Sequence, residues 1–330
     1  MRRSPASPFK LFRWGLSWPA GRRLVKPLTK RLIDLLVLLF GLTTLLFFAL
    51  KAAGDPVAVL AGNDATPEQI AALRAQYGFD RPLAVQYLLY MLNVVQLDFG
   101  ASLATGQPAL MEVLRRLPAT LLLAVLGMGV TVLLSVPIGA WLGFRPDAPG
   151  RRIAAAVVFF FQGVPGFVFA LVLIQIFVVQ LMWLPSLGYA SPATWLLPSI
   201  AIASFLAPKL IRVVAANVAE AMREDYIRTA RAVGASPGDL LWREALPNAV
   251  LGATALIGTQ FAFLISGAVI IEVLFLWPGI GLLLFKSTQA LDFPVIQAFA
   301  FVVAIMVFAI NSLTDVMFRA IDPRLRRAGP

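Results

Sequence analysis

The chain has 330 residues, of which 59% are hydrophobic and only 14% are charged, and its mean hydropathy is +0.83. This composition excludes the pair of soluble domains that the length alone would suggest. The absence of Cys and His excludes disulfides, thiolate or imidazole metal sites and a Ser-His-Asp triad. The net charge of +11 is interpreted as a membrane topology signal, and we expect no nucleic-acid partner.

Stretches of about 20 apolar residues, the length that crosses a bilayer as a helix, occur five times. They are residues 32–50, 117–144, 153–208, 245–271 and 293–314. The third is too long for one span and contains two prolines and a glycine between residues 183 and 192, so we expect it to fold back there. Small residues after the first stretch would permit a signal peptide, but its basic leader and apolar run are both too long. The sequence therefore predicts an all-α integral membrane protein with six transmembrane helices.

The basic residues are distributed unevenly over the segments between these spans. Residues 1–31, 145–152, 209–243 and those from 319 onward hold 22 of the 28. The positive-inside rule assigns these segments, and both termini, to the cytoplasm. The predicted organisation is a basic tail (1–31), a first transmembrane helix (32–50), an extracytoplasmic segment (51–112), a core with five transmembrane helices (113–321) and a second tail (322–330). The other six basic residues are Lys51, Arg74, Arg81, Arg115, Arg116 and Lys286.

The extracytoplasmic segment contains a helix-start signal. Thr66-Pro67-Glu68-Gln69 has the spacing of a capping box and predicts a helix through Ala75 that Gly78 stops. A second amphipathic run covers residues 83–95. Such a segment could dock a soluble partner or cover the mouth of a pore, and composition favours neither.

The segment 220–247 is too charged to span a membrane but keeps apolar residues at helical spacing. Gly234 is suited to the left-handed conformation that ends a helix, and Ser236 is suited to the N-cap of the next. We expect Glu224 and Arg228 to pair one turn apart, and Leu246-Pro247 to close the second helix at the membrane. A hairpin lying on anionic lipid is the alternative, which its acidic residues argue against.

Several motifs now resemble one known family. The run from Asp225 to Gly234, followed after nine residues by Glu244-Ala245-Leu246-Pro247, resembles the EAA loop of ABC importer permeases, in the form typical of the dipeptide, oligopeptide and nickel branch. Further matches in the right order are Gly54-Asp55-Pro56, Thr66-Pro67-Glu68-Gln69, Arg116-Leu117-Pro118-Ala119-Thr120, Trp277-Pro278-Gly279-Ile280-Gly281, Asp292-Phe293-Pro294 and Asp322-Pro323-Arg324.

The resemblance implies a type I (MetI-like) permease core with an extracytoplasmic insertion after the first helix, located in the inner membrane. It implies four kinds of partner: a second homologous permease subunit, cytoplasmic ATPase subunits, an extracytoplasmic solute-binding protein and membrane lipid. The chain itself is expected to be no enzyme and to hold no cofactor or metal, because ATP and Mg would be bound by the ATPase. Consistently, the sequence contains no G-x-x-x-x-G-K-[ST] phosphate loop.

The resemblance also suggests roles for particular residues. The helix around Glu68 and Arg74 is the candidate contact for the binding protein, and Gln162, Pro165 and Gln260 are the pathway candidates. Glu272, Trp277, Pro278 and Gly279 form either an interfacial turn anchored by tryptophan, or an external gate in which Glu272 meets a cation of the partner subunit. The expected ATPase-coupling residues are Asp225, Arg228, Thr229, Ala230, Gly234, Ser236, Leu246 and Pro247.

One motif that bears on the substrate departs from the family pattern. Gln162-Gly163-Val164-Pro165-Gly166-Phe167 departs from the Leu-Pro-Ser-Phe that the branch usually has there. We expect di- or oligopeptides, with a nickel chelate or an opine as the alternative. A secondary transporter would need ionisable groups near the bilayer midplane, whereas Asp34, Asp315 and Glu272 lie near span ends. A non-transporting scaffold would leave the polar residues within the spans unexplained.

Overall fold

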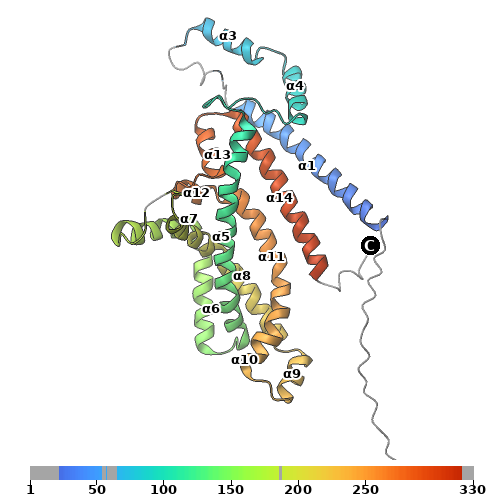
Figure 1. Ribbon diagram of the computed structural model, residues 1–330, viewed down its shortest axis with the longest axis vertical. Coiled ribbons are helices and arrows are strands. Elements are labelled where there is room, and N and C mark those ends of the chain that lie inside the picture. The colour runs from blue at the N-terminus through green and yellow to red at the C-terminus, as the bar shows by residue number, and fades with distance from the viewer. Residues whose placement is uncertain (1–21, 54–56, 58–64, 186–187, 322–330) are drawn as a thin grey trace, which may run out of the picture.

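The computed structural model describes residues 22–53, 57, 65–185 and 188–321, and every regular element within them is a helix. Residues 1–21 of the first predicted tail, all of the second, and the motifs at residues 54–56 and 322–324 lie outside this part of the chain. The helices form an elongated bundle (Figure 1). Their bounds are α1 Arg22–Ala53, α3 Pro67–Tyr77, α4 Leu83–Val95, α5 Ala109–Phe144, α6 Pro149–Gln162, α7 Gly166–Leu173, α8 Pro192–Ala221, α9 Asp225–Ala232, α10 Pro237–Asp239, α11 Leu246–Gly267, α12 Val269–Leu274, α13 Ile280–Gln289 and α14 Phe293–Ile321, with π-helices η1 Ile174–Gln180 and η2 Leu240–Ala245.

Among the described residues, five continuous helical stretches are long and apolar enough to cross a membrane, and one bent pair makes a possible sixth. The five lie in α1, α5, α8, the run from Pro237 to Gly267, and α14. The six-span prediction therefore agrees with the structure if the bent pair counts as one span. That pair, α6 with α7 and η1, is bent by 97°. The bend falls at Pro165, which lacks an N–H and keeps the preceding residue out of helical geometry.

The centre of the bundle is the contact between α5 and α8, the most extensively packed pair of helices. Glycines on α5 allow the close approach. A Cβ at Gly143 would collide with the carbonyl oxygen of Ala215, and one at Gly139 would meet the side chain of Val214 at 2.7 Å. Small residues at such positions let two helix backbones pack tightly where burial from water cannot supply the attraction.

Of the two helices predicted in this segment, α4 has the expected bounds, and α3 has the expected start and cap but ends at Tyr77, two residues later than predicted. In α3, the Thr66 hydroxyl accepts from the Gln69 N–H and the Gln69 side chain accepts from the Thr66 N–H, while Gly78 ends the helix at a φ of +68°. Figure 1 shows α3, α4 and α13 at one end of the bundle and α9 and α10 at the other. The two regions predicted to meet soluble partners thus lie at opposite ends.

Candidate functional site

The helical hairpin at one end of the bundle consists of α9, α10 and η2, between α8 and α11. Gly234 has a φ of +91° and lies in the turn, as the sequence predicted. Ser236 caps the next helix, because its hydroxyl accepts from the Asp239 N–H at 3.1 Å. Ile227 is fully buried against Ala221, Leu240 and Ala245. It thereby attaches α9 to the end of α8 and to η2.

The opposite side of the hairpin faces outward. The side chain of Asp225 is 92% exposed and that of Arg228 is 74% exposed, and the two form a pair at 3.1 Å. Val233 is 81% exposed, and Trp242 is also exposed. The hairpin therefore presents charged and apolar side chains that no described part of the chain covers.

Three details of the hairpin differ from the sequence prediction. The first helix is interrupted between Ala221 and Asp225, where the structure has a turn. Arg228 pairs with Asp225 rather than Glu224, because Glu224 is in extended conformation before the helix begins. Leu246-Pro247 does not end a helix: the run from Pro237 to Gly267 is continuous. Pro247 has no N–H to donate to the preceding turn. The π-helix η2, immediately before Leu246, shifts the hydrogen bonds there so that the helix continues through the proline.

Among the other predicted coupling residues, Thr229 donates its hydroxyl to the Asp225 carbonyl and so binds within its own helix. Ala230 packs beside Ile227 and Leu246 packs against the α5 and α8 core, so both support the hairpin from within. The structure thus divides the predicted set into exposed residues and supporting residues.

At the opposite end of the bundle, the Glu272 carboxylate is completely buried. One oxygen accepts from the Thr120 hydroxyl at 2.6 Å. The other accepts from the N–H groups of Gly281 and Leu282, at 2.7 and 3.1 Å. Thr120 in turn accepts from the Ile280 N–H at 2.9 Å. The side chains of Glu272 and Thr120 therefore satisfy the backbone donors that open α13, a role that helix N-termini require. We call these groups, together with Trp277, the Glu272 cluster.

Trp277 is also fully buried, and its indole N–H donates to the Ala119 carbonyl at 2.9 Å. It is therefore no exposed interfacial anchor, which corrects one of the two interpretations of this motif. Gly279 is required here, because a Cβ would collide with the Glu272 carboxylate. Pro278 is exposed at the turn beside them. The hydrogen bonds of Glu272 go to its own subunit, which leaves the predicted contact with a partner's cation without support.

The three pathway candidates do not come together as one site. Gln162 and Pro165 are exposed at the bend between α6 and α7. Gln260 is buried in α11, where its amide N–H donates to the Leu206 carbonyl and its oxygen has no hydrogen-bond partner among the described residues. Glu68 and Arg74 are both exposed on α3, as a docking surface would require.

Sequence reasoning missed the partners of the buried carboxylates. Thr120 belongs to the motif that begins at Arg116, but nothing in the sequence indicated that it contacts Glu272. Asp292 is similarly buried and accepts from the Ser102 hydroxyl at 2.5 Å and the Leu103 N–H at 3.1 Å. A charged residue in an otherwise apolar stretch was the signal available for both, because such a charge requires a buried partner.

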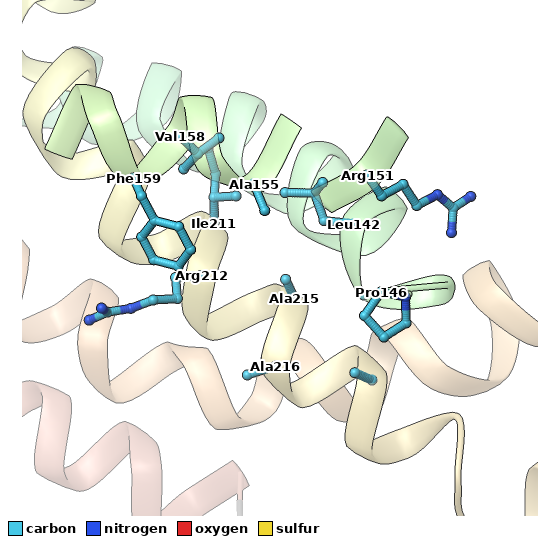
Figure 2. A pocket seen from close by; sticks show the side chains of 12 residues that line it. Leu142, Pro146, Arg151, Ala155, Val158, Phe159, Ile211, Arg212, Ala215 and Ala216 are labelled. Atoms are coloured by element: carbon cyan, nitrogen blue, oxygen red, sulfur yellow. The ribbon is translucent and has the colours of Figure 1, made fainter. Parts of the chain in front are cut away.

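An apolar groove lies between α5, α6 and α8 near the hairpin end, with a volume of about 180 Å³. Figure 2 shows Arg151 and Arg212 at its two ends, with side chains extending away from each other. Its floor is formed by small and apolar residues such as Ala155, Ile211 and Ala215. The groove therefore offers few polar groups that could hold a polar solute.

The membrane-length helices, a hairpin that projects at one end and buried polar turns at the other define the chain as a polytopic membrane protein. Comparison with known proteins identifies which kind. Residues 135–327 match the binding-protein-dependent transport system inner membrane component family, and residues 24–124 match its N-terminal family. The chain belongs to this family of ABC importer permeases, in the oligopeptide branch.

Individual relatives support this family assignment. The glutathione transport system permease protein GsiC of Salmonella choleraesuis is 36% identical over 302 residues, which cover 90% of this chain and 97% of the relative. GsiC of Escherichia coli strain K12 is 35% identical with the same coverage. Inward-facing structures of the MetNI methionine ABC transporter share the fold, with a TM-score of 0.52 at 18% identity over 64% of this chain and 96% of theirs. The chain is therefore a multi-pass inner-membrane permease component, and ATP hydrolysis belongs to a separate subunit. This excludes the secondary-transporter and scaffold alternatives.

The Glu272 cluster yields a stability prediction. Glu272→Ala removes the acceptor of the Gly281 and Leu282 N–H groups and should lower the free energy of unfolding by at least about 2 kcal/mol. Glu272→Gln keeps one acceptor oxygen and should cost less. Thermal unfolding in detergent, followed by tryptophan fluorescence, measures both, and Glu68→Ala on the exposed face of α3 is the control. Equal unfolding temperatures for Glu272→Ala and Glu68→Ala would contradict the role given to the buried carboxylate.

Proposed function

We propose that this chain forms one half of the transmembrane pathway of an importer for short peptides or peptide-like solutes. A second permease subunit would complete the pathway, a binding protein would deliver the solute, and ATPase subunits would bind the α9–η2 hairpin. The observation that carries the proposal is this hairpin: it is anchored through buried Ile227 and leaves Asp225, Arg228 and Val233 exposed at the end of the bundle.

The hairpin is suited to transmit motion into the membrane. The helical run from Pro237 to Gly267 connects it to the opposite end without a break, and α12 with Glu272 follows directly. A movement imposed on the hairpin would therefore shift one end of a rod whose other end reaches the Glu272 cluster. Coupling of this kind requires an element with two arrangements that ATP binding favours differently.

Support for a peptide-like solute comes from the relatives, which are named as glutathione permeases. A nickel chelate or an opine is the alternative within the same branch. The chain has no His or Cys, the side chains that bind nickel most readily, so a chelate would have to be recognised through its organic ligand.

The turn at Gly234 gives a test of coupling. A β-branched residue in the left-handed conformation costs roughly 1–2 kcal/mol, so Gly234→Val should reorient the turn and weaken the ATPase interface. We expect membrane insertion to persist and ATP-driven uptake to be lost. Uptake into vesicles and pull-down of the ATPase measure the two effects. Gly238→Val, in the same hairpin but without a positive φ, is the matched control. Normal uptake by Gly234→Val would instead favour a hairpin that rests on lipid.

Sidedness is tested with single cysteines, for which this cysteine-free chain is well suited. Both termini and the hairpin are proposed to be cytoplasmic and residues 55–112 external. Ala72→Cys on α3 should react with a membrane-impermeant maleimide in intact cells, whereas Lys30→Cys and Gly150→Cys should react only after permeabilisation. All three positions are exposed. Labelling of Lys30→Cys from outside would overturn the six-span arrangement.

The exposed face of α3 is proposed to contact the binding protein through Glu68 and Arg74. Reversing both charges, with Glu68→Lys and Arg74→Glu, should weaken docking of the binding protein severalfold, because rim charges steer association. The docking affinity in detergent as a function of salt is the measurement. Unchanged docking and unchanged delivery would assign α3 to covering the pathway instead.

A further inference from the structure

A hollow of about 430 Å³ lies at the end of the bundle opposite the hairpin. Its volume is within the roughly 300–1,000 Å³ typical of small-molecule sites. It is formed by three separate parts of the chain: the first turns of α5, the residues before α8, and the turn and helix from Pro278 to Lys286. The lining residues are Arg115, Arg116, Pro118, Ala119, Tyr189, Pro278, Leu282 and Lys286.

The charges of this hollow are unusual for its side of the protein. Only six of the 28 basic residues fall in segments assigned to the exterior, and three of those six, Arg115, Arg116 and Lys286, line this hollow. The positive-inside rule disfavours basic residues there, so membrane topology does not account for the cluster.

Acidic residues neutralise these cations only in part. Glu112 lies 3.6 Å from Arg116, one turn earlier in α5. Neither Arg115 nor Lys286 forms an ion pair with any residue that the structure describes. The carboxylate of Glu272, beneath the floor, is enclosed by Thr120 and the start of α13. The hollow therefore has an excess of positive charge that attracts anions.

The rest of the lining is apolar or aromatic. Tyr189 is 42% exposed and lies against Trp195 and Trp277, with ring centroids 5.8 and 5.0 Å apart. Pro278 and Leu282 complete this part of the lining. Cations beside a flat apolar surface suit a small organic acid that has both a carboxylate and an apolar portion.

The floor of the hollow is directly connected to the Glu272 cluster. Ala119, which lines the hollow, accepts the indole N–H of Trp277, and Leu282, which also lines it, donates its N–H to Glu272. A solute held here would therefore lie against backbone groups that form the Glu272 cluster.

We propose that this hollow binds a carboxylate of the solute as it enters the pathway, through Arg115, Arg116 and Lys286. The proposal deepens the proposed function and rests on it for the identity of the solute. Its chemistry selects solutes with at least one free carboxylate and disfavours those whose carboxylates are blocked.

The first test measures the anion preference directly. Tyr189→Cys places the only thiol of the chain in the hollow, and its rates of reaction with an anionic sulfonatoethyl and a cationic trimethylammonioethyl methanethiosulfonate are compared. The ratio of anionic to cationic rate should exceed that of Ala72→Cys by about tenfold or more, because clustered charge raises the local concentration of counter-ions. Adding Arg115→Gln and Lys286→Gln should bring the ratio to that of Ala72→Cys. Equal ratios at the two positions from the start would overturn the proposal.

The second test identifies the source of the carboxylate. S-methylglutathione, which has no thiol, should slow the anionic reagent at Tyr189→Cys, and its dimethyl ester should not. In the complete importer, Arg115→Gln with Lys286→Gln should lower uptake of S-methylglutathione about tenfold while binding-protein docking persists. Arg81→Gln, an external arginine outside the hollow, is the matched control. If the double variant loses docking and the peptide gives no protection, the cations bind acidic residues of the binding protein, and the proposal is wrong.

Failure of the carboxylate site and failure of the proposed function give different results. If the wild-type importer takes up S-methylglutathione and the double variant takes it up equally well, the carboxylate site is refuted and the proposed function stands. If the wild-type importer takes up no peptide, the proposed function fails, and the reagent ratio at Tyr189→Cys still decides whether the hollow prefers anions.

Discussion

The constraint on which this structure depends is that no backbone donor can be left unpaired away from water, so every break between helices needs a replacement hydrogen bond. At the end opposite the hairpin, buried carboxylates supply these bonds. Glu272 and Thr120 satisfy the first N–H groups of α13, and Asp292 satisfies the loop at Leu103. The acidic side chains of this region are therefore structural parts of the turns that contain them. Without Glu272 and Thr120, the first N–H groups of α13, which packs against α5, would lose these acceptors.

The hairpin end follows the same constraint by other means. Ser236 caps one helix, and the backbone between α9 and α10 turns at Gly234, which needs no side chain to adopt a positive φ. The two ends are joined by the continuous run from Pro237 to Gly267. This run begins within the hairpin and leads, through α12, to the Glu272 cluster.

Local signals in the sequence were sufficient for much of this fold. The cap of α3, the bounds of α4 and the turn at Gly234 could be predicted because each depends on a few adjacent residues. The 97° bend at Pro165 and the continuity through Pro247 could not, because the same residue type interrupts one helix and is accommodated by a π-helix in the other. The pairing of Thr120 with Glu272 joins residues 152 positions apart, and no local pattern encodes it. Nor could the sequence show that Arg115 and Lys286 line one hollow, since this depends on how α13 folds back.

The π-helix before Leu246 has a consequence for the hairpin's direction. Each residue of an α-helix advances it by 1.5 Å and turns it by about 100°, and a π turn contains one residue more than an α turn. The extra residue in η2 therefore sets the angle at which the hairpin leaves the rod. The interval of nine residues between Gly234 and Glu244 therefore sets the rotation of the hairpin about the helix axis as well as its distance along that axis. Two permeases with the same side chains but a different interval would direct their hairpins to different sides of the bundle.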